Sequence, residues 1–343
     1  MKSSMQALVS DLQNLSEEIS LGPVLGAAID NLDPDNKILK SQRSARSKRM
    51  AYVHGIISMY GLIEEHVDNL IMEVASTYEQ IYATYSDLPE NVRARHREYS
   101  LRVLLDGDRV PLRDPINEVV CLNVLAANYN NLPLQLNPAA FTYSTANYRH
   151  AHIFDLMLRL DLDITGALTS QSVQSALADS GLEFRDAEGL IIDLVSRRND
   201  VAHSYQTVEL LTVDVLSAYL DVISAYMKQL FSIASEHLLR ILSQNKLTSI
   251  GKVVNSWRER AAVGVDMTAG QIMAPCKVLF VKGQRTFVRN ALSLRSNEIT
   301  IGGKLESDGD VIQLGIGLDS ALPSAVEGSE VFILPDRWIH LAI

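Results

Sequence analysis

The sequence predicts an α+β protein of two parts, a large all-α helical bundle followed by a small all-β domain, either a barrel or a sandwich. Up to about residue 260, apolar residues recur in steps of three and four, the period of an amphipathic helix. From about residue 275 they form short runs separated by Gly- and Asp-containing turns, which is typical of strands. We therefore expect a helical domain over 1–262, with helices inserted in it, and a small β domain over 271–343.

The N-terminal region indicates helices of unequal length. Residues 1–36 predict one or two short helices broken at Gly22-Pro23, because proline has no backbone N–H and disrupts a helix interior. A long helix is expected over about 38–80. Its apolar face is marked by Tyr52, Ile56, Met59, Ile63, Val67, Leu70 and Val74.

Shorter helices are expected in the middle of the chain. After a basic cluster within 88–105, which we interpret as solvated, 106–115 reads as a loop. Helices should cover 115–131 and 145–160, separated by the proline-bearing stretch 133–138. A short helix near 170–178 and a helix over about 187–203, capped by Asp186, complete this part.

A regular apolar seam follows, and Thr207 is the expected cap of its helix. The seam consists of Val213, Leu216, Leu220, Ile223, Met227, Leu230, Ala234, His237 and Ile241. A seam of this kind packs either within one chain or across a dimer. A last helix over about 248–260 and a soft segment between Gly264 and Gly270 should precede the strands.

Charge and composition narrow the function classes. The net charge of −10 excludes a global basic field, so nucleic-acid binding would need local basic patches. One such patch begins the long helix, where basic residues recur every third position and fan around the axis. It is either a solvated helix start or an RNA-contacting surface, with Arg46 and Arg49 as candidate substrate-binding residues.

Two cysteines, without metal-ligand spacing, point away from a disulfide framework or a zinc site, and we expect no metal and no cofactor. The N-terminus lacks the apolar stretch of a secretory signal, and no apolar run reaches the length that spans a bilayer. These observations predict a cytoplasmic protein without membrane contact.

The chemistry concentrates in Arg197-Arg198-Asn199-Asp200-Val201-Ala202-His203, at the end of the 187–203 helix. Arg198 and His203 stand about 140° apart around a regular helix and about 7.5 Å apart along it, so they flank a groove. Arginine binds phosphate as a charged fork, and histidine transfers protons near neutral pH. Metal-free RNA cleavage by the 2′-hydroxyl fits this set but needs two proton-transfer groups, which two motifs in a dimer would supply. The alternative is a helix C-terminal cap.

The motif from Arg198 to His203 resembles the Arg-x4-6-His motif of the HEPN superfamily, in which a polar residue follows the arginine. Its place between two helices and the upstream helix with Ile63-Glu64-Glu65 are similar too, over about residues 40–245. The resemblance implies a metal-independent endoribonuclease, acting as a homodimer and leaving 2′,3′-cyclic phosphate, of the toxin or anti-phage defence type.

By the same resemblance Arg198 would activate the phosphate, His203 would transfer protons and Asn199 would position them, while Arg197 would contact RNA. Glu64 or Glu65 is a possible acidic partner of these arginines, and both also suit ordinary surface pairs. The expected partners are RNA, a second copy of the chain and an antitoxin or defence-system protein. The alternative function is a non-catalytic HEPN-like module that binds a nucleotide or a partner such as a nucleotidyltransferase.

Overall fold

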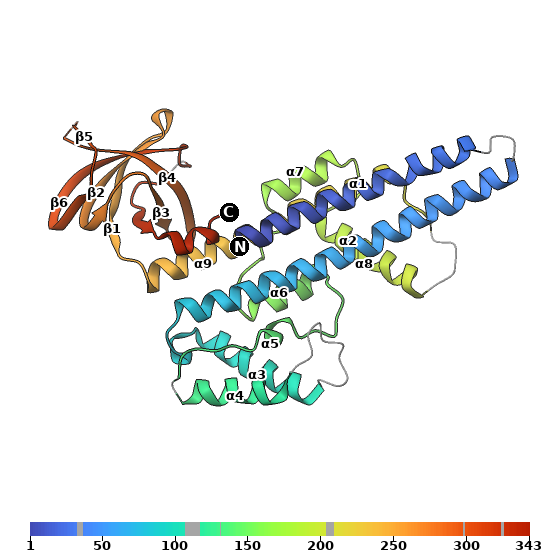
Figure 1. Cartoon of the computed structure of the whole chain (residues 1–343), viewed down its shortest axis with the longest axis horizontal. Helices are drawn as coiled ribbons and strands as arrows, with labels where there is room; N and C mark the ends of the chain where they lie inside the picture. Colours follow the sequence, from blue (N-terminus) through green and yellow to red (C-terminus); the bar gives the residue numbers. More distant parts are fainter. Residues whose placement is uncertain (33–36, 107–116, 131, 204–208, 298, 324–325) are drawn as a thin grey trace. The chain divides into compact units, whose positions relative to one another are not determined.

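The structure is a computed structural model that describes residues 1–32, 37–106, 117–130, 132–203, 209–297, 299–323 and 326–343. Within this part the chain forms nine α-helices and then seven strands (Figure 1). It divides into two compact units. The helical unit comprises 3–79 and 83–233, and the barrel unit comprises 234–343 with 1–2 and 80–82. Among the described residues, no helix combines the length and apolar character needed to cross a membrane.

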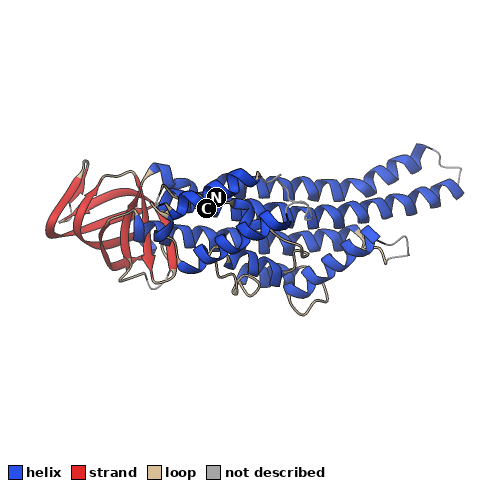
Figure 2. Cartoon of the chain, turned by 90° about the horizontal axis from the view of Figure 1, so that it is seen from below, coloured by secondary structure: helices blue, strands red, loops and turns tan. Residues whose placement is uncertain are grey.

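Two long helices, α1 (Lys2–Leu32) and α2 (Lys37–Ile81), run side by side in opposite directions (Figures 1 and 2). Polar pairs join them along their length: Ser4 with Glu73, Asp11 with His66 and Glu18 with His54. The predicted helix over 38–80 is confirmed, and the seven residues of its apolar face are all buried.

The predicted break at Gly22-Pro23 is wrong, because α1 continues through both residues. Tertiary pairing with α2 overrides the local preference of proline. A Cβ added to Gly22 would lie 3.2 Å from the Cβ of Ala51, so the glycine serves the close approach of the two helices. The Ser47 hydroxyl, 3.5 Å from the Gly22 carbonyl oxygen, donates a hydrogen bond there.

The other helices include all those predicted up to the apolar seam and three, over 85–87, 90–106 and 138–142, that were not predicted. They are η1 (Tyr85–Asp87), α3 (Glu90–Asp106), α4 (Glu118–Tyr129), α5 (Pro138–Thr142), α6 (His150–Leu158), α7 (Gln171–Asp179), α8 (Ala187–His203) and α9 (Val213–Asn245). Asp186 caps α8 as predicted, because its Oδ1 accepts a hydrogen bond from the Gly189 backbone N–H at 2.9 Å. The expected loop after α3 and the Thr207 cap lie outside the described residues. In the seam of α9, every predicted position from Leu216 onward is buried.

The strands form one antiparallel barrel (Figure 2). They are β1 (Ser249–Trp257), β2 (Ala262–Ile272), β3 (Cys276–Lys282), β4 (Arg285–Ser296), β5 (Ile299–Ile301), β6 (Leu305–Leu318) and β7 (Glu330–Leu334), with 3-10 turns at η2 (Arg258–Arg260) and η3 (Asp336–Leu341). The order is β3-β7-β1-β2-β6-β4-β5, and β3 also pairs with β4. This last pairing closes six strands around an apolar core and decides between barrel and sandwich.

The predicted helix over 248–260 is wrong, and the segment between Gly264 and Gly270 is a strand interior. In β1 and β2 the buried residues Ile250, Val253, Val263, Val265 and Met267 face the barrel core. Ile250, Val253 and Trp257 also fit steps of three and four, which is why the sequence pattern was ambiguous. The strands therefore begin at Ser249, earlier than the predicted start of the β domain.

We expect Gly251→Ala to destabilise the barrel. A Cβ at this position would lie 2.0 Å from the carbonyl oxygen of Asp266, so β1 would have to separate from β2. The free energy of unfolding, measured in urea, should fall by about 2–3 kcal/mol. Gly303→Ala is the matched control, because nothing lies within 4 Å of its added Cβ. Equal stability of the two variants would contradict the tight β1–β2 approach.

His96 is an exception within the basic cluster of α3, because it is fully buried. Its Nε2 accepts a hydrogen bond from the Asn137 backbone N–H at 2.9 Å, and its ring stacks on Phe141. Burial lowers the pKa of His96 from 6.5 to about 4. The neutral ring is therefore part of the folded helical unit.

Stability should consequently decrease on acidification between pH 6.5 and 4. In this window the unfolded chain binds a proton at His96 that the folded chain excludes, so the free energy of unfolding falls as pH falls. The full loss is about 3 kcal/mol. Urea unfolding of the parent and of His96→Gln at pH 7, 5.5 and 4.5 isolates this contribution. Identical pH slopes in the two proteins would contradict a neutral buried His96.

Candidate functional site

The motif predicted from sequence occupies the last turns of α8. The apolar residues Leu190, Ile191, Leu194 and Val195 are buried, so this side of α8 packs inside the helical unit. Arg197, Arg198 and Asn199 are partly buried, whereas Asp200 is exposed. The two neighbouring arginines thus stand at the boundary between core and solvent, and their surroundings differ.

Arg197 is held by the protein itself. Its Nε lies 2.6 Å from Oδ2 of Asp193, one turn back on α8, and its Nη1 donates to the carbonyl oxygen of Glu209 at 3.1 Å. Nη1 also lies 3.4 Å from the hydroxyl of Tyr52 on α2, and Tyr219 of α9 donates to Asp193 at 2.6 Å. Burial opposes the charge, but the hydrogen bonds to Tyr52 and Asp193 outweigh it and raise the pKa of Arg197. This network joins α8 to α2 and α9.

Arg198 has a different environment. Its Cζ lies 4.8 Å from the ring centroid of Tyr60 on α2, a cation–π distance. Its Nη1 donates to Oδ1 of Asn199 at 3.1 Å, which is its one hydrogen bond among the described residues. A guanidinium carries five N–H donors. Most of the donors of Arg198 therefore remain for a ligand.

Tyr60 and Glu64 form the wall beside Arg198. They are four residues apart on α2 and so share one helix face. Burial raises the pKa of Tyr60 to about 12, and the nearby Glu64 carboxylate adds to this rise, while Arg198 acts in the opposite sense. Tyr60 therefore stays a neutral hydroxyl at physiological pH. We call Tyr60, Glu64, Arg198 and Asn199 the Arg198 cluster.

The segment before α6 supports this cluster. The Tyr148 backbone N–H donates to the Tyr60 hydroxyl at 3.2 Å, and Oδ1 of Asn147 lies 3.5 Å from the same hydroxyl. The Tyr148 hydroxyl donates to Oδ1 of Asp68 at 2.6 Å, and burial together with Asp68 raises its pKa. Sequence reasoning missed Tyr60, Tyr148 and Asp68, and it considered Asn147 only as a polar residue at a helix end or in a metal site. The spacing of Tyr60, Glu64 and Asp68 in steps of four was the signal that marks their shared face.

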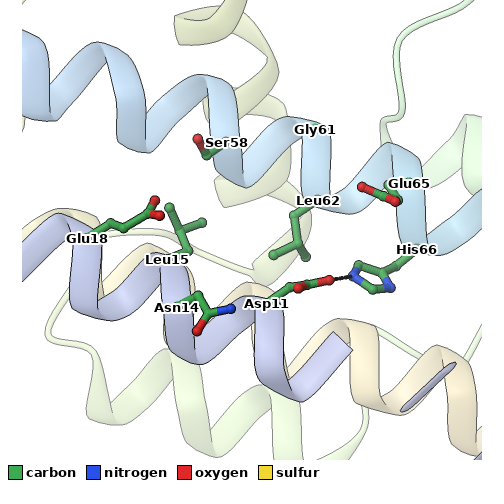
Figure 3. A pocket seen from close by; sticks show the side chains of 9 residues that line it. All are labelled: Asp11, Asn14, Leu15, Glu18, Ser58, Gly61, Leu62, Glu65 and His66. Carbon is green, nitrogen blue, oxygen red and sulfur yellow. Dashed lines mark hydrogen bonds and ion pairs between the residues drawn. The ribbon is translucent and has the colours of Figure 1, made fainter. Parts of the chain in front are cut away.

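The structure separates the two candidate acidic partners. Glu64 lies with Tyr60 and Arg198, whereas Glu65 lines a recess between α1 and α2 (Figure 3). This cavity of about 390 Å³ also contains Glu18 and the pair of Asp11 with buried His66, whose Nε2 lies 2.9 Å from Oδ2 of Asp11. Glu64 is therefore the acidic residue that the fold brings to the motif.

The structure gives less detail on the remaining predicted site residues. α8 ends at His203, but its side chain lies outside what the structure describes. Arg46 and Arg49 are exposed on α2. They lie 14 and 11 residues before Tyr60, close to whole turns, and so share its side of the helix about 21 and 16 Å along the axis.

The motif lies inside a region that matches a known family. A family model described as RiboL-PSP-HEPN matches residues 13–236, which is more than half of the 343-residue chain. The match contains the whole Arg198 cluster and ends before the first strand. Comparisons with curated proteins and with solved structures gave no match.

We expect Arg197→Ala and Arg198→Ala to differ in stability. Loss of Arg197 leaves Asp193 in a half-buried site without its ion pair, so the free energy of unfolding should fall by about 1–3 kcal/mol. Loss of the cation–π contact of Arg198 should lower it by about 1 kcal/mol or less. Thermal and urea unfolding measure both, with Ser196→Ala, an exposed residue of α8, as control. An equal loss in both arginine variants would refute the division of roles.

Proposed function

The chain belongs to the RiboL-PSP-HEPN family, and on this premise we propose that it is a metal-independent endoribonuclease acting at the Arg198 cluster. The observation that carries the proposal is the state of Arg198. Its guanidinium is oriented by the Tyr60 ring and the Asn199 amide, yet among the described residues it donates a single hydrogen bond. It is therefore positioned and still able to bind a phosphate.

The proposed reaction uses the ribose itself as nucleophile. A base removes the 2′-hydroxyl proton, the 2′-oxygen attacks the adjacent phosphorus, and an acid protonates the leaving 5′-oxygen. The products are a 2′,3′-cyclic phosphate and a 5′-hydroxyl end. Arg198 stabilises the negative charge that develops on the phosphoryl oxygens. His203 transfers a proton, and Asn199 holds Arg198 through its side-chain oxygen.

Glu64 and Arg197 have positioning roles in this proposal. Glu64 lies close enough to the Tyr60 hydroxyl to raise its pKa, and the Tyr60 ring forms the wall over which the Arg198 guanidinium lies. Arg197 faces Asp193, Tyr52 and the Glu209 carbonyl, so we assign it to holding α8 in place instead of contacting RNA. Arg46 and Arg49 would extend the phosphate-binding side of α2 away from the centre.

The reaction requires a second copy of the motif. One motif supplies one histidine, whereas the mechanism needs a base and an acid. A two-fold dimer whose α8 ends face each other would supply two histidines and two Arg198 side chains to one cleft. We propose that the functional form is such a homodimer, active in the cytoplasm as a toxin or anti-phage effector and controlled by an antitoxin or defence-system protein.

Replacing the proposed groups should remove RNA cleavage without unfolding the protein. In Arg198→Ala and His203→Ala, cleavage of a single-stranded RNA in EDTA should fall by about 100-fold or more. Ser196→Ala should retain the parent rate. The product ends are identified by their resistance to ligation and by mass. Dilution below the dimer dissociation constant should lower the rate per chain.

Full cleavage by His203→Ala would overturn the proposed mechanism. Absence of cleavage by the parent across many RNAs, alone and with partner proteins, would instead identify a non-catalytic module. In that case Arg198 would bind the phosphate of a nucleotide, and the affinity for the nucleotide should still depend on Arg198→Ala. Calorimetric titration with ATP and GTP distinguishes this outcome.

A further inference from the structure

The barrel unit exposes a tryptophan beside bare backbone. The chain has two tryptophans, of which Trp338 is 3% exposed and Trp257, at the end of β1, is 46% exposed. A Cβ added to Gly264 would lie 3.2 Å from Cη2 of Trp257, so the indole ring covers this glycine on the outside of the barrel. One side of a large aromatic ring is thus packed while much of the ring remains accessible.

Small residues, mostly glycines, line the surface next to the Trp257 ring. Gly264 of β2 pairs with Gly315 of β6, which pairs with Arg295 of β4. In the adjacent row Ala262 pairs with Gly317, and the side chain of Ser293 on β4 lies over Gly317, because a Cβ added there would meet the Ser293 hydroxyl. Their neighbours Val263, Leu314 and Ile316 point into the core, so these small residues point outward. Three strand spacings, about 14 Å, separate β1 from β4 across this face.

Three arginines lie near the end of the barrel that carries Trp257. Arg258 and Arg260 directly follow Trp257, and Arg295 is exposed at the other side of the glycine rows. Among the described residues these three guanidinium groups have no hydrogen bond or ion pair. The carboxylates near this end are Glu259, Asp319 and Asp266. Asn290 Nδ2 donates to Oδ2 of Asp319 at 2.5 Å. Asp266 follows Gly264 by two residues on the outer face and is paired across the strands with Lys252 of β1.

The acidic residues Glu306, Asp308 and Asp310 begin β6, at the opposite end of the β2–β6 pairing. Asp308 precedes Gly317 by nine residues, which corresponds to about 30 Å of strand. The barrel is close to neutral as a whole, yet the end with Trp257 carries arginines that lack protein partners. An accessible aromatic ring flanked by available cations matches a ligand that has both a flat base and a phosphate.

We propose that this face, formed by Trp257, Arg258, Arg260 and Arg295, binds single-stranded RNA. An unpaired base would stack on the indole and the neighbouring phosphates would contact the arginines. Duplex RNA keeps its bases stacked inside the helix, so it offers no free ring to Trp257. That the ligand is RNA rests on the proposed function, whereas the accessible ring and the arginines around it are features of the barrel alone. The face would hold substrate RNA while the Arg198 cluster cleaves it.

The test uses the full chain carrying His203→Ala, so that RNA is bound without being cut. A 12-nucleotide oligoadenylate RNA is titrated while the intrinsic tryptophan fluorescence is recorded. Stacking should quench Trp257, and buried Trp338 supplies a constant background. In a 5′-fluorescein anisotropy assay, Trp257→Ala should weaken binding by about fivefold or more, whereas Trp257→Tyr should retain most of the affinity.

Matched arginine variants test the charge component. Arg295→Ala should weaken binding and reduce the slope of log affinity against log salt by about 0.7, the loss of one phosphate contact. Arg285→Ala, also exposed and on β4 but at the opposite end of the strand, should bind like the parent. Gly315→Gln should weaken binding by placing a side chain on the bare surface, and circular dichroism confirms the fold of every variant.

Unchanged RNA affinity in folded Trp257→Ala, or binding without quenching, would overturn the proposal. Equal affinity for the oligoadenylate and for a 12-base-pair duplex would also overturn it. The result is independent of catalysis. If the protein binds RNA through Trp257 but never cleaves it, only the proposed function is refuted. If the protein cleaves RNA and Trp257→Ala binds RNA as tightly as the parent, only the proposed binding face is refuted.

Discussion

The ion pair between Arg197 and Asp193 is the interaction on which the candidate site depends. Tyr219 of α9 donates to Asp193, and Arg197 reaches Tyr52 of α2, so one half-buried pair connects three helices at the end of α8. Charges in such a site are stable only when their remaining donors and acceptors are satisfied. Arg197 satisfies this requirement, whereas the neighbouring Arg198 lies at the boundary with most of its donors available.

The surroundings of Arg198 combine orientation with availability. The Tyr60 ring contacts the guanidinium without using its N–H groups, and the Tyr148 backbone N–H and the Asn147 side chain hold the phenol hydroxyl. Burial keeps this hydroxyl neutral, so Tyr60 adds no charge to the site. A cation positioned against the neutral Tyr60 ring suits the stabilisation of charge that develops during a reaction. The barrel, by contrast, presents Trp257 and arginines on its surface, an arrangement that we propose binds single-stranded RNA.

Much of the helical unit was predictable because its long elements repeat a strong pattern. The faces of α2 and α9 were marked by apolar residues in steps of three and four, and these residues are buried. Prediction failed where local and tertiary preferences disagree. α1 continues through Gly22-Pro23 because it pairs with α2 over its length, and β1 is a strand because β2 and β7 pair with it. The pattern from Ile250 to Trp257 suits either structure.

The sequence by itself determined the family, the two-part architecture and the motif from Arg198 to His203, because these depend on periodicity and on residues close together in the chain. Tertiary structure alone decided that Arg197 is held by other residues of the protein and that Arg198 keeps donors available for a ligand. It also decided that Glu64, not Glu65, lies beside the motif, since one residue rotates a side chain by 100° around a helix. Neighbours in sequence therefore face different helices, and only packing shows which one each meets.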